Sequence, residues 1–160
     1  MTSGQCVNVV GGVVIAFAIA LPSAANADWA YTHWGMTPEQ VAAASAGGVM
    51  VLPPAKRTRD EADHWEIAAE GSYTDGMLTF PVGFTFDTQS GGLKCVMYNA
   101  LGNDVEALRI AMVKRYGNPS AESDFMSSHT MTWRTPDSIE LTIGQRPVAA
   151  VVAHCQPDAH

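Results

Sequence analysis

The residues best suited to chemistry form a short segment in the last third of the chain, Met126, His129 and Met131. Thioethers and an imidazole are soft ligands of the kind that bind Cu(I). On a strand, His129 and Met131 share one face, whereas Met126 precedes the strand. The segment is therefore a weak candidate for a metal site. The competing interpretation places Met131 in the core and His129 at its rim.

A second group of metal-ligand types lies at the C-terminus, where His160 follows His154 and Cys155. Zinc would require Cys155 as a thiolate, together with ligands from elsewhere in the chain. A disulfide with Cys95 competes for the same sulfur. If the first residues, which include Cys6, are removed as a signal, Cys95 and Cys155 are the two cysteines that remain, and an oxidising compartment favours their pairing. The sequence predicts the Cys95–Cys155 bridge, with two free thiols in neighbouring strands as the alternative.

The chain lacks the common catalytic motifs. It contains no H-E-x-x-H, G-x-S-x-G, C-x-x-C, phosphate loop or G-x-G-x-x-G. A catalytic triad is a geometry and is not readable from scattered Ser, His and Asp residues. We therefore expect no catalytic residue and no cofactor. The net charge of −7 argues against nucleic-acid binding, which depends on clustered cations.

Residues 1–27 have the pattern of a secretory signal. An apolar run from Val9 to Leu21 precedes Pro22 and ends at Ala25-Asn26-Ala27, an A-x-A cleavage site. The run is too short to span a membrane comfortably as a helix. We expect cleavage before Asp28, a periplasmic or secreted protein, and a single domain over residues 28–160.

Trp29, Tyr31 and Trp34 form an aromatic group at the start of this mature chain. Trp and Tyr are enriched at the energetic centres of interfaces, so the group is a candidate interaction surface. The alternative is that the segment packs onto the sheet as part of the core.

The elements that position these residues follow from caps, turns and periodicity. Thr37, Pro38 and Gln40 predict a capping box and a helix to about Ala46. Asn103 and Glu106 predict a second capped helix, ending at Gly117-Asn118-Pro119. Residues 49–62, with Pro53-Pro54, resemble an exposed loop. Six strands are predicted, at residues 64–73, 78–86, 93–98, 129–134, 138–143 and 147–154.

Two of these strands carry specific expectations. In the first, Trp65, Ile67 and Ala69 alternate and are expected on one face. In the second, every even position from Leu78 to Phe86 is apolar, which predicts a half-buried strand. Pro81 lacks an N–H group, so this strand is expected at an edge or with imperfect pairing. The fold class is α+β, with two short helices packed on an antiparallel β-meander in the order α-β-β-β-α-β-β-β.

Four segments of the chain resemble small exported bacterial proteins of uncharacterised function. They are the helix start Trp34-Gly35-Met36-Thr37-Pro38-Glu39-Gln40-Val41, the strand end at residues 84–87, the segment 93–96 and the helix end at residues 116–119. The layout is also similar to the helix-plus-meander module of the beta-lactamase-inhibitor-protein and SmpA/OmlA type. SmpA/OmlA relatives are lipid-anchored, and this chain lacks their cysteine at the cleavage site. The resemblance implies a binding module without naming a partner.

These observations favour a soluble, non-catalytic periplasmic module that binds an envelope protein or another envelope component. Its surface would be the open face of the sheet or the aromatic N-terminus. The alternative is a periplasmic carrier of a metal or a small ligand, and an enzyme is the third hypothesis.

Overall fold

The computed structural model describes residues 29–146 and 148–157, so the predicted signal segment 1–27 and His160 lie outside the described residues. The described part contains two α-helices, a short 3-10 helix and nine strands. They follow the chain as α1 (Pro38–Ala44), β1 (Val49–Val51), the 3-10 helix (Pro54–Lys56), β2 (Thr58–Asp60), β3 (Trp65–Asp75), β4 (Leu78–Asp87), β5 (Leu93–Leu101), α2 (Asp104–Tyr116), β6 (Ala121–Phe125), β7 (Ser128–Arg134), β8 (Ser138–Gln145) and β9 (Val148–Cys155).

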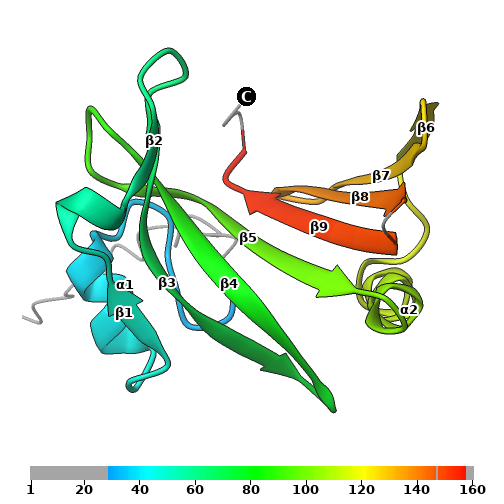
Figure 1. Ribbon diagram of the computed structural model, residues 1–160, viewed down its shortest axis with the longest axis horizontal. Helices are drawn as coiled ribbons and strands as arrows, with labels where there is room; N and C mark the ends of the chain where they lie inside the picture. The colour runs from blue at the N-terminus through cyan, green and yellow to red at the C-terminus, as the bar shows by residue number, and fades with distance from the viewer. Residues whose placement is uncertain (1–28, 147, 158–160) are drawn as a thin grey trace, which may run out of the picture.

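All nine strands belong to one antiparallel sheet in the spatial order β1-β3-β4-β5-β9-β8-β7-β6, with β2 paired to β3. Figure 1 shows the two halves of the sheet meeting where β5 lies beside β9. Each half is a chain of hairpins, and α2 follows β5 before the second half begins. The predicted α+β class and the order of its elements are confirmed.

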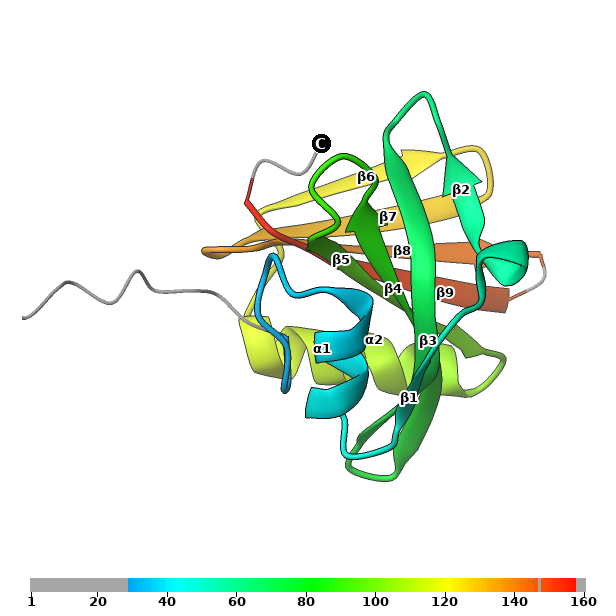
Figure 2. The ribbon, with the colours of Figure 1, turned by 90° about the vertical axis from the view of Figure 1, so that its left-hand side faces the viewer.

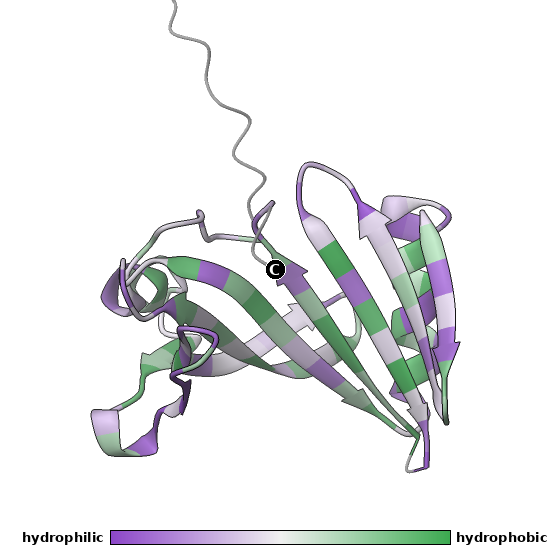
Figure 3. Ribbon diagram, turned by 90° about the horizontal axis from the view of Figure 1, so that it is seen from above, coloured by the Kyte–Doolittle hydropathy of each residue, from purple (hydrophilic) through white to green (hydrophobic). Residues whose placement is uncertain are grey.

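The two faces of the sheet differ in burial. Phe84 of β4, Val96 of β5 and Ile139 of β8 are fully buried in one hydrophobic core. Hydrophobic and hydrophilic residues alternate along the strands in Figure 3, as the period of two requires. Helices α1 and α2 lie on the same side of the sheet in Figure 2 and contribute buried residues to this core. We call the opposite side, which neither helix covers, the open face.

Local caps explain α1 but not α2. The Thr37 N–H donates to Gln40 Oε1 at 2.8 Å and the Gln40 N–H donates to Thr37 Oγ1 at 3.4 Å, so the predicted capping box is formed. At the start of α2, Asn103 makes no side-chain cap hydrogen bond. Its backbone is already helical, and the carboxylate of Glu106 instead accepts hydrogen bonds from Arg109. The second capping box was therefore a wrong prediction.

Two further expectations need correction. Residues 49–62 are not a simple loop, because β1 and β2 both pair with β3 in this range. A bulge between Ile67 and Ala69 reverses the alternation of β3, so Ala69 is buried in the core while Ile67 lines a cleft on the open face.

Of the two alternatives expected for Pro81, the structure shows imperfect pairing. Strand β4 lies inside the sheet, and Pro81 is tolerated because the pairing of β4 with β5 stops at Val82.

Candidate functional site

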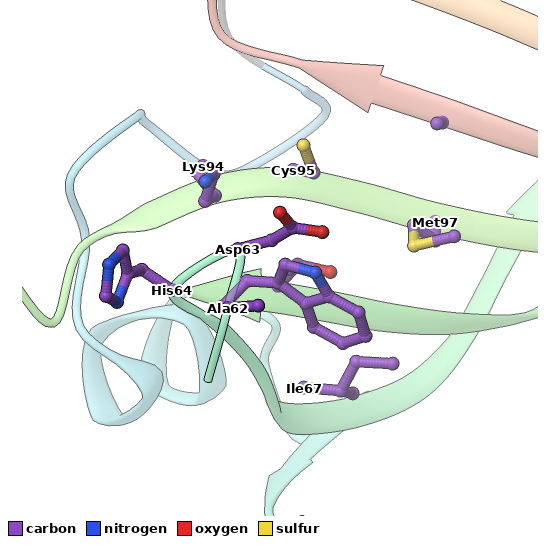
Figure 4. A pocket seen from close by; sticks show the side chains of 10 residues that line it. Ala62, Asp63, His64, Ile67, Lys94, Cys95 and Met97 are labelled. Atoms are coloured by element: carbon purple, nitrogen blue, oxygen red, sulfur yellow. The ribbon is translucent and has the colours of Figure 1, made fainter. Parts of the chain in front are cut away.

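A cleft of about 660 Å³ lies on the open face, between the turn that joins β2 to β3 and the strands β3, β4, β5 and β9. We call it the open-face cleft, and Figure 4 shows it from close by. Its lining residues are Ala62, Asp63, His64, Trp65, Ile67, Thr85, Lys94, Cys95, Met97 and Ala153.

The sheet register brings these side chains together. Ile67, Thr85 and Cys95 are consecutive partners across β3, β4 and β5. Met97 lies two residues after Cys95 and pairs with Ala153 of β9. Because residues two apart on a strand share a face, all five line the same side of the sheet. The bulge in β3 is what turns Ile67 toward this side.

The floor of the open-face cleft contains a buried hydroxyl without a partner. Thr85 is only 5% exposed, and its Oγ1 makes no hydrogen bond within the described part of the chain. Buried polar groups are nearly always paired, because an unmade hydrogen bond costs about 1–3 kcal/mol. The Oγ1 atom is shielded from solvent, so its unmade hydrogen bond is a local cost to stability.

The polar side chains are spread over part of the cleft. In Figure 4, His64 and Lys94 lie on one side, Ile67 and Met97 lie on the other, and the carboxylate of Asp63 lies between them. The wall is therefore amphipathic.

Charge pairs hold β2, which carries the overhanging turn, against β3. Glu66 accepts hydrogen bonds from Arg57 at 2.9 Å and from Arg59 at 2.6 Å. Partial burial acts to raise the pKa of Glu66, but the two guanidinium groups outweigh it and hold the pKa below its usual value. In the turn, Asp60 Oδ1 accepts the backbone N–H groups of Ala62 and Asp63. These contacts fix the position of the turn between β2 and β3, which borders the cleft.

The predicted disulfide between Cys95 and Cys155 is formed and joins β5 to β9 beside the cleft. Its Cα atoms are 4.0 Å apart, and 60 residues separate the two cysteines. In the chain-entropy account, closing a loop of this length stabilises the fold by about 4 kcal/mol. The bond ties together the two halves of the sheet where they meet.

On the opposite, buried face lies a hydrogen-bonded group of three side chains. Asp137 accepts the Trp34 Nε1–H at 2.9 Å through Oδ1 and contacts His154 Nε2 at 2.7 Å through Oδ2. Burial lowers the pKa of His154 below its usual value, and the neighbouring carboxylate only partly opposes this. The arrangement anchors the N-terminal segment to β9. Asp137 and His154 are deeply buried and Trp34 is half-buried, so the polar atoms of this group are enclosed.

The aromatic N-terminal residues pack on the core face. Trp29 is 3% exposed, and its ring lies 4.5 Å from that of Tyr73 and 5.9 Å from that of Phe84. Tyr31 and Trp34 are half-buried against the same core. The three side chains therefore lie where the alternative prediction placed them, packed onto the sheet as part of the core.

The structure does not bring the candidate metal ligands together. Met126 is 92% exposed at the turn before β7, whereas Met131 is buried in the core. Both ring nitrogens of His129 are paired with carboxylates: Nδ1 lies 2.8 Å from Asp124 Oδ1, and Nε2 lies 3.1 Å from Glu122 Oε2. Among the described residues, no group of three or more His, Cys, Asp or Glu side chains could hold a metal ion.

Cys155 and His154, the described candidate ligands of the C-terminal zinc site, are both already engaged. Cys155 is in the disulfide, so its sulfur is not a thiolate. His154 is paired with Asp137 on the other side of β9.

Comparisons with protein-family models, with curated proteins and with solved structures find no match to this chain. In the part of the chain that the structure describes, no helix is long and apolar enough to cross a membrane. Sequence reasoning did not find the open-face cleft. The available signal was the row of small residues at the odd positions of β4, which includes Gly83 and Thr85.

Proposed function

We propose that this protein is an exported, non-catalytic binding module whose ligand occupies the open-face cleft. The observation that carries the proposal is the cleft itself, whose walls are mostly apolar and whose lining includes the charged side chains of Asp63 and Lys94. Ligand sites are concave and mostly apolar, with a few polar groups that fix orientation. The cleft has this composition.

The lining residues support binding over catalysis. The Cys95 sulfur is held in the disulfide, and the Thr85 hydroxyl has no base beside it. An activated nucleophile requires a general base within hydrogen-bond reach. Neither Cys95 nor Thr85 is therefore activated as a nucleophile.

Export is supported by the signal pattern of residues 1–27 and by the disulfide, since such bonds persist in oxidising compartments. The intact mass of the protein recovered from its own host tests this. The expected mass begins at Asp28 and is two hydrogens lighter than that of the reduced chain. An uncleaved chain with all three cysteines reduced would refute export.

Binding in the cleft is testable with a neutral apolar dye, N-phenyl-1-naphthylamine, whose fluorescence rises when it leaves water. Ala153 lies on the cleft floor, so Ala153→Leu fills the space. Ala121 lies in the same cross-strand row, on β6. It is three strands away from Ala153, or about 14 Å. Ala121→Leu is therefore a matched control with the same added volume on the same face.

We expect saturable dye binding to the native protein and to Ala121→Leu, and binding weakened about tenfold in Ala153→Leu, since the loss of a filled apolar site is worth 1–2 kcal/mol. Equal binding by the two variants would contradict the proposal. So would the absence of saturable binding to the native protein.

A further inference from the structure

The Cys95–Cys155 disulfide belongs to a row of side chains that crosses the open face. Thr85 of β4 is the direct cross-strand partner of Cys95 on β5, and Cys95 is the direct partner of Cys155 on β9. Side chains directly opposite each other on one face have Cβ atoms about 4.5–5.5 Å apart. The unpaired Thr85 hydroxyl is therefore within side-chain reach of Cys95, on the side away from Cys155.

The two sulfurs of the disulfide differ in access. The lining of the open-face cleft includes Cys95 but not Cys155, which is only 9% exposed. Beyond Cys155 the row continues with Ser138 of β8, which is 8% exposed. Figure 4 shows the Cys95 sulfur projecting from β5 toward β9 at the edge of the cleft. A small molecule in the cleft meets Cys95 before it meets Cys155.

The direction of a thiol–disulfide exchange follows from this arrangement. Exchange begins when a thiolate attacks one of the two sulfurs, and access helps to determine which. The attack runs along the axis of the S–S bond, so a thiolate reaches the Cys95 sulfur from the side opposite Cys155. Because β5 lies between β4 and β9, this is the β4 side, over which the cleft extends. The geometry thus selects Cys95 as the attacked sulfur and Cys155 as the leaving thiolate.

The Thr85 hydroxyl distinguishes the oxidised state from the reduced state. While the disulfide is intact, Thr85 Oγ1 makes no hydrogen bond within the described residues, and the bond to Cys155 fixes the Cys95 sulfur. Once the bond is broken, Cys95 can change its side-chain rotamer and accept a hydrogen bond from the Thr85 hydroxyl. The bond is strongest to the thiolate, because charge-assisted hydrogen bonds are the strong ones. Reduction therefore satisfies a buried group that oxidation leaves unpaired.

We infer that Cys95 is a site of thiol–disulfide exchange with low-molecular-weight thiols that enter the open-face cleft, and that Thr85 is a positioning residue that favours the reduced state. In its disulfide, Cys95 is the electrophile of this reaction, so it requires no base to activate it. The inference goes beyond the proposed function, because no step requires a non-covalent ligand in the cleft.

The exchange proceeds in two balanced steps. The sulfur of an incoming thiolate bonds to the Cys95 sulfur as the Cys95–Cys155 bond breaks, and Cys155 leaves as a thiolate that takes up a proton. A second thiolate then attacks the external sulfur of this mixed disulfide, and Cys95 leaves as a thiolate beside Thr85. Two external thiols are oxidised to one disulfide, and the protein disulfide is reduced to two thiols.

Charged side chains in the cleft lining act on the Cys95 thiolate in opposite directions. The Lys94 ammonium favours the thiolate, the Asp63 carboxylate opposes it, and His64 favours it only when protonated. The Thr85 hydroxyl carries no charge. Its contribution can therefore be separated from theirs by substitutions at position 85 alone.

The first experiment identifies the attacked sulfur in the native, oxidised protein. The protein is incubated briefly with glutathione, and N-ethylmaleimide then caps the free thiols. Trypsin places the two cysteines in different peptides, because Arg109 and Arg134 lie between them. We expect glutathione on Cys95 and maleimide on Cys155, in about tenfold excess over the reverse arrangement. Equal labelling, the reverse arrangement or no mixed disulfide would overturn the inference.

Filling the cleft tests the route of entry. Ala153→Leu should slow formation of the mixed disulfide about tenfold, because it occupies the space through which the thiol approaches Cys95. Ala121→Leu, three strands away on the same face, should react at the native rate. Equal rates in the two variants would show that the thiol does not enter through the cleft.

The second experiment tests Thr85 at equilibrium with reduced and oxidised glutathione. The equilibrium constant for reduction should be about tenfold smaller in Thr85→Val, which lacks the hydrogen bond that only the reduced state makes. Thr85→Ser should restore the native value. Thr32→Val, whose lost hydrogen bond to the Trp29 carbonyl is present in both states, should leave the constant unchanged. Equal constants for Thr85→Val and the native protein, or a change in Thr32→Val, would overturn the role of Thr85.

The pH profile of alkylation provides a readout that a purely structural role would not change. In the reduced protein, shown to be folded by circular dichroism, the rate of reaction of Cys95 with iodoacetamide follows its thiolate fraction. We expect the pKa of the Cys95 thiol to be about one pH unit lower in the native protein and in Thr85→Ser than in Thr85→Val. The same pKa in all three proteins, or a reduced chain that is unfolded, would contradict the inference.

The outcomes separate this inference from the proposed function. Saturable dye binding that is weakened by Ala153→Leu, with no mixed disulfide at Cys95, would overturn the inference and leave the proposed function standing. Exchange at Cys95 in a protein that binds no dye would support the inference and refute the proposed function.

Discussion

Replacing Thr85 with valine tests the open-face cleft without any knowledge of its ligand. The hydroxyl of Thr85 is buried and unpaired, and valine replaces it with a methyl group of similar shape. Leaving a buried hydroxyl unsatisfied costs about 1–3 kcal/mol, whereas an apolar group of the same shape carries no such penalty. We therefore expect Thr85→Val to raise the free energy of unfolding by about 1 kcal/mol, the lower end of that range.

Thr32 provides the matched control, because it is equally buried but paired. It is 0% exposed, and its Oγ1 donates to the Trp29 carbonyl at 2.8 Å. Thr32→Val removes this hydrogen bond, so we expect the free energy of unfolding to fall by about 1 kcal/mol. The same chemical change thus has opposite signs at the two sites.

Urea denaturation followed by far-ultraviolet circular dichroism measures both changes, with unchanged m-values required for the comparison. A Thr85→Val variant destabilised as much as Thr32→Val would refute the reasoning, because it would mean that the Thr85 hydroxyl already has a partner.

Three further predictions concern the rest of the fold. Burial holds the pKa of His154 below its unfolded value of about 6.5. The stability that neutral His154 contributes is therefore complete above pH 6.5 and is lost as the pH falls. Between about pH 7.5 and pH 5, the urea midpoint of the native protein should fall, and that of His154→Gln should fall by a smaller amount. Trp34→Phe leaves Asp137 Oδ1 without its donor and should lower the free energy of unfolding by about 1–3 kcal/mol, and an unchanged urea midpoint would count against the anchoring role of Trp34. Reducing the Cys95–Cys155 bond with dithiothreitol should lower the free energy of unfolding by about 4 kcal/mol, and a double Cys→Ala variant should show no response to the reductant.

The elements that sequence analysis predicted well are those determined locally. The capping box of α1 needs only residues three apart in the chain, and both of its hydrogen bonds are present. The alternation of β4 reflects the period of a strand, and Phe80, Val82, Phe84 and Phe86 are all buried as it predicts. In each case the physical cause lies within the segment itself.

The absent capping box of α2 has a local cause, because Glu106 pairs with Arg109 three residues away. The other errors have non-local causes. The bulge in β3 exists only in relation to its partner β4, where the pairing moves from Ile67–Thr85 to Ala69–Phe84. No feature of the β3 sequence alone specifies it. Likewise, β1 and β2 are three residues each, and their pairing with β3 depends on a strand that follows them in the chain. Short strands of this kind carry too few residues for a period to be detected.

The candidate site illustrates the same limit. The open-face cleft combines Asp63, on the turn after β2, with Ala153, near the end of β9, and 90 residues separate them in the sequence. Only the register across β3, β4, β5 and β9 brings them together. Trp29 and Trp34 are conspicuous in the sequence, but Trp29 is buried in the core and Trp34 packs against it, because aromatic area is most stabilising there.

Two buried polar atoms lack a partner within the described residues, and comparing them shows which one costs the fold more. His154 Nδ1 lies on the core face, where the other ring nitrogen of the same side chain is held by Asp137 at 2.7 Å. That single contact fixes the ring and leaves only a lone pair unsatisfied. The Thr85 hydroxyl has no such compensation, because its only polar side-chain atom makes no hydrogen bond within the described residues. The free-energy cost of leaving it unpaired is therefore larger, and Thr85 is the position at which an apolar residue of the same shape should stabilise the fold most.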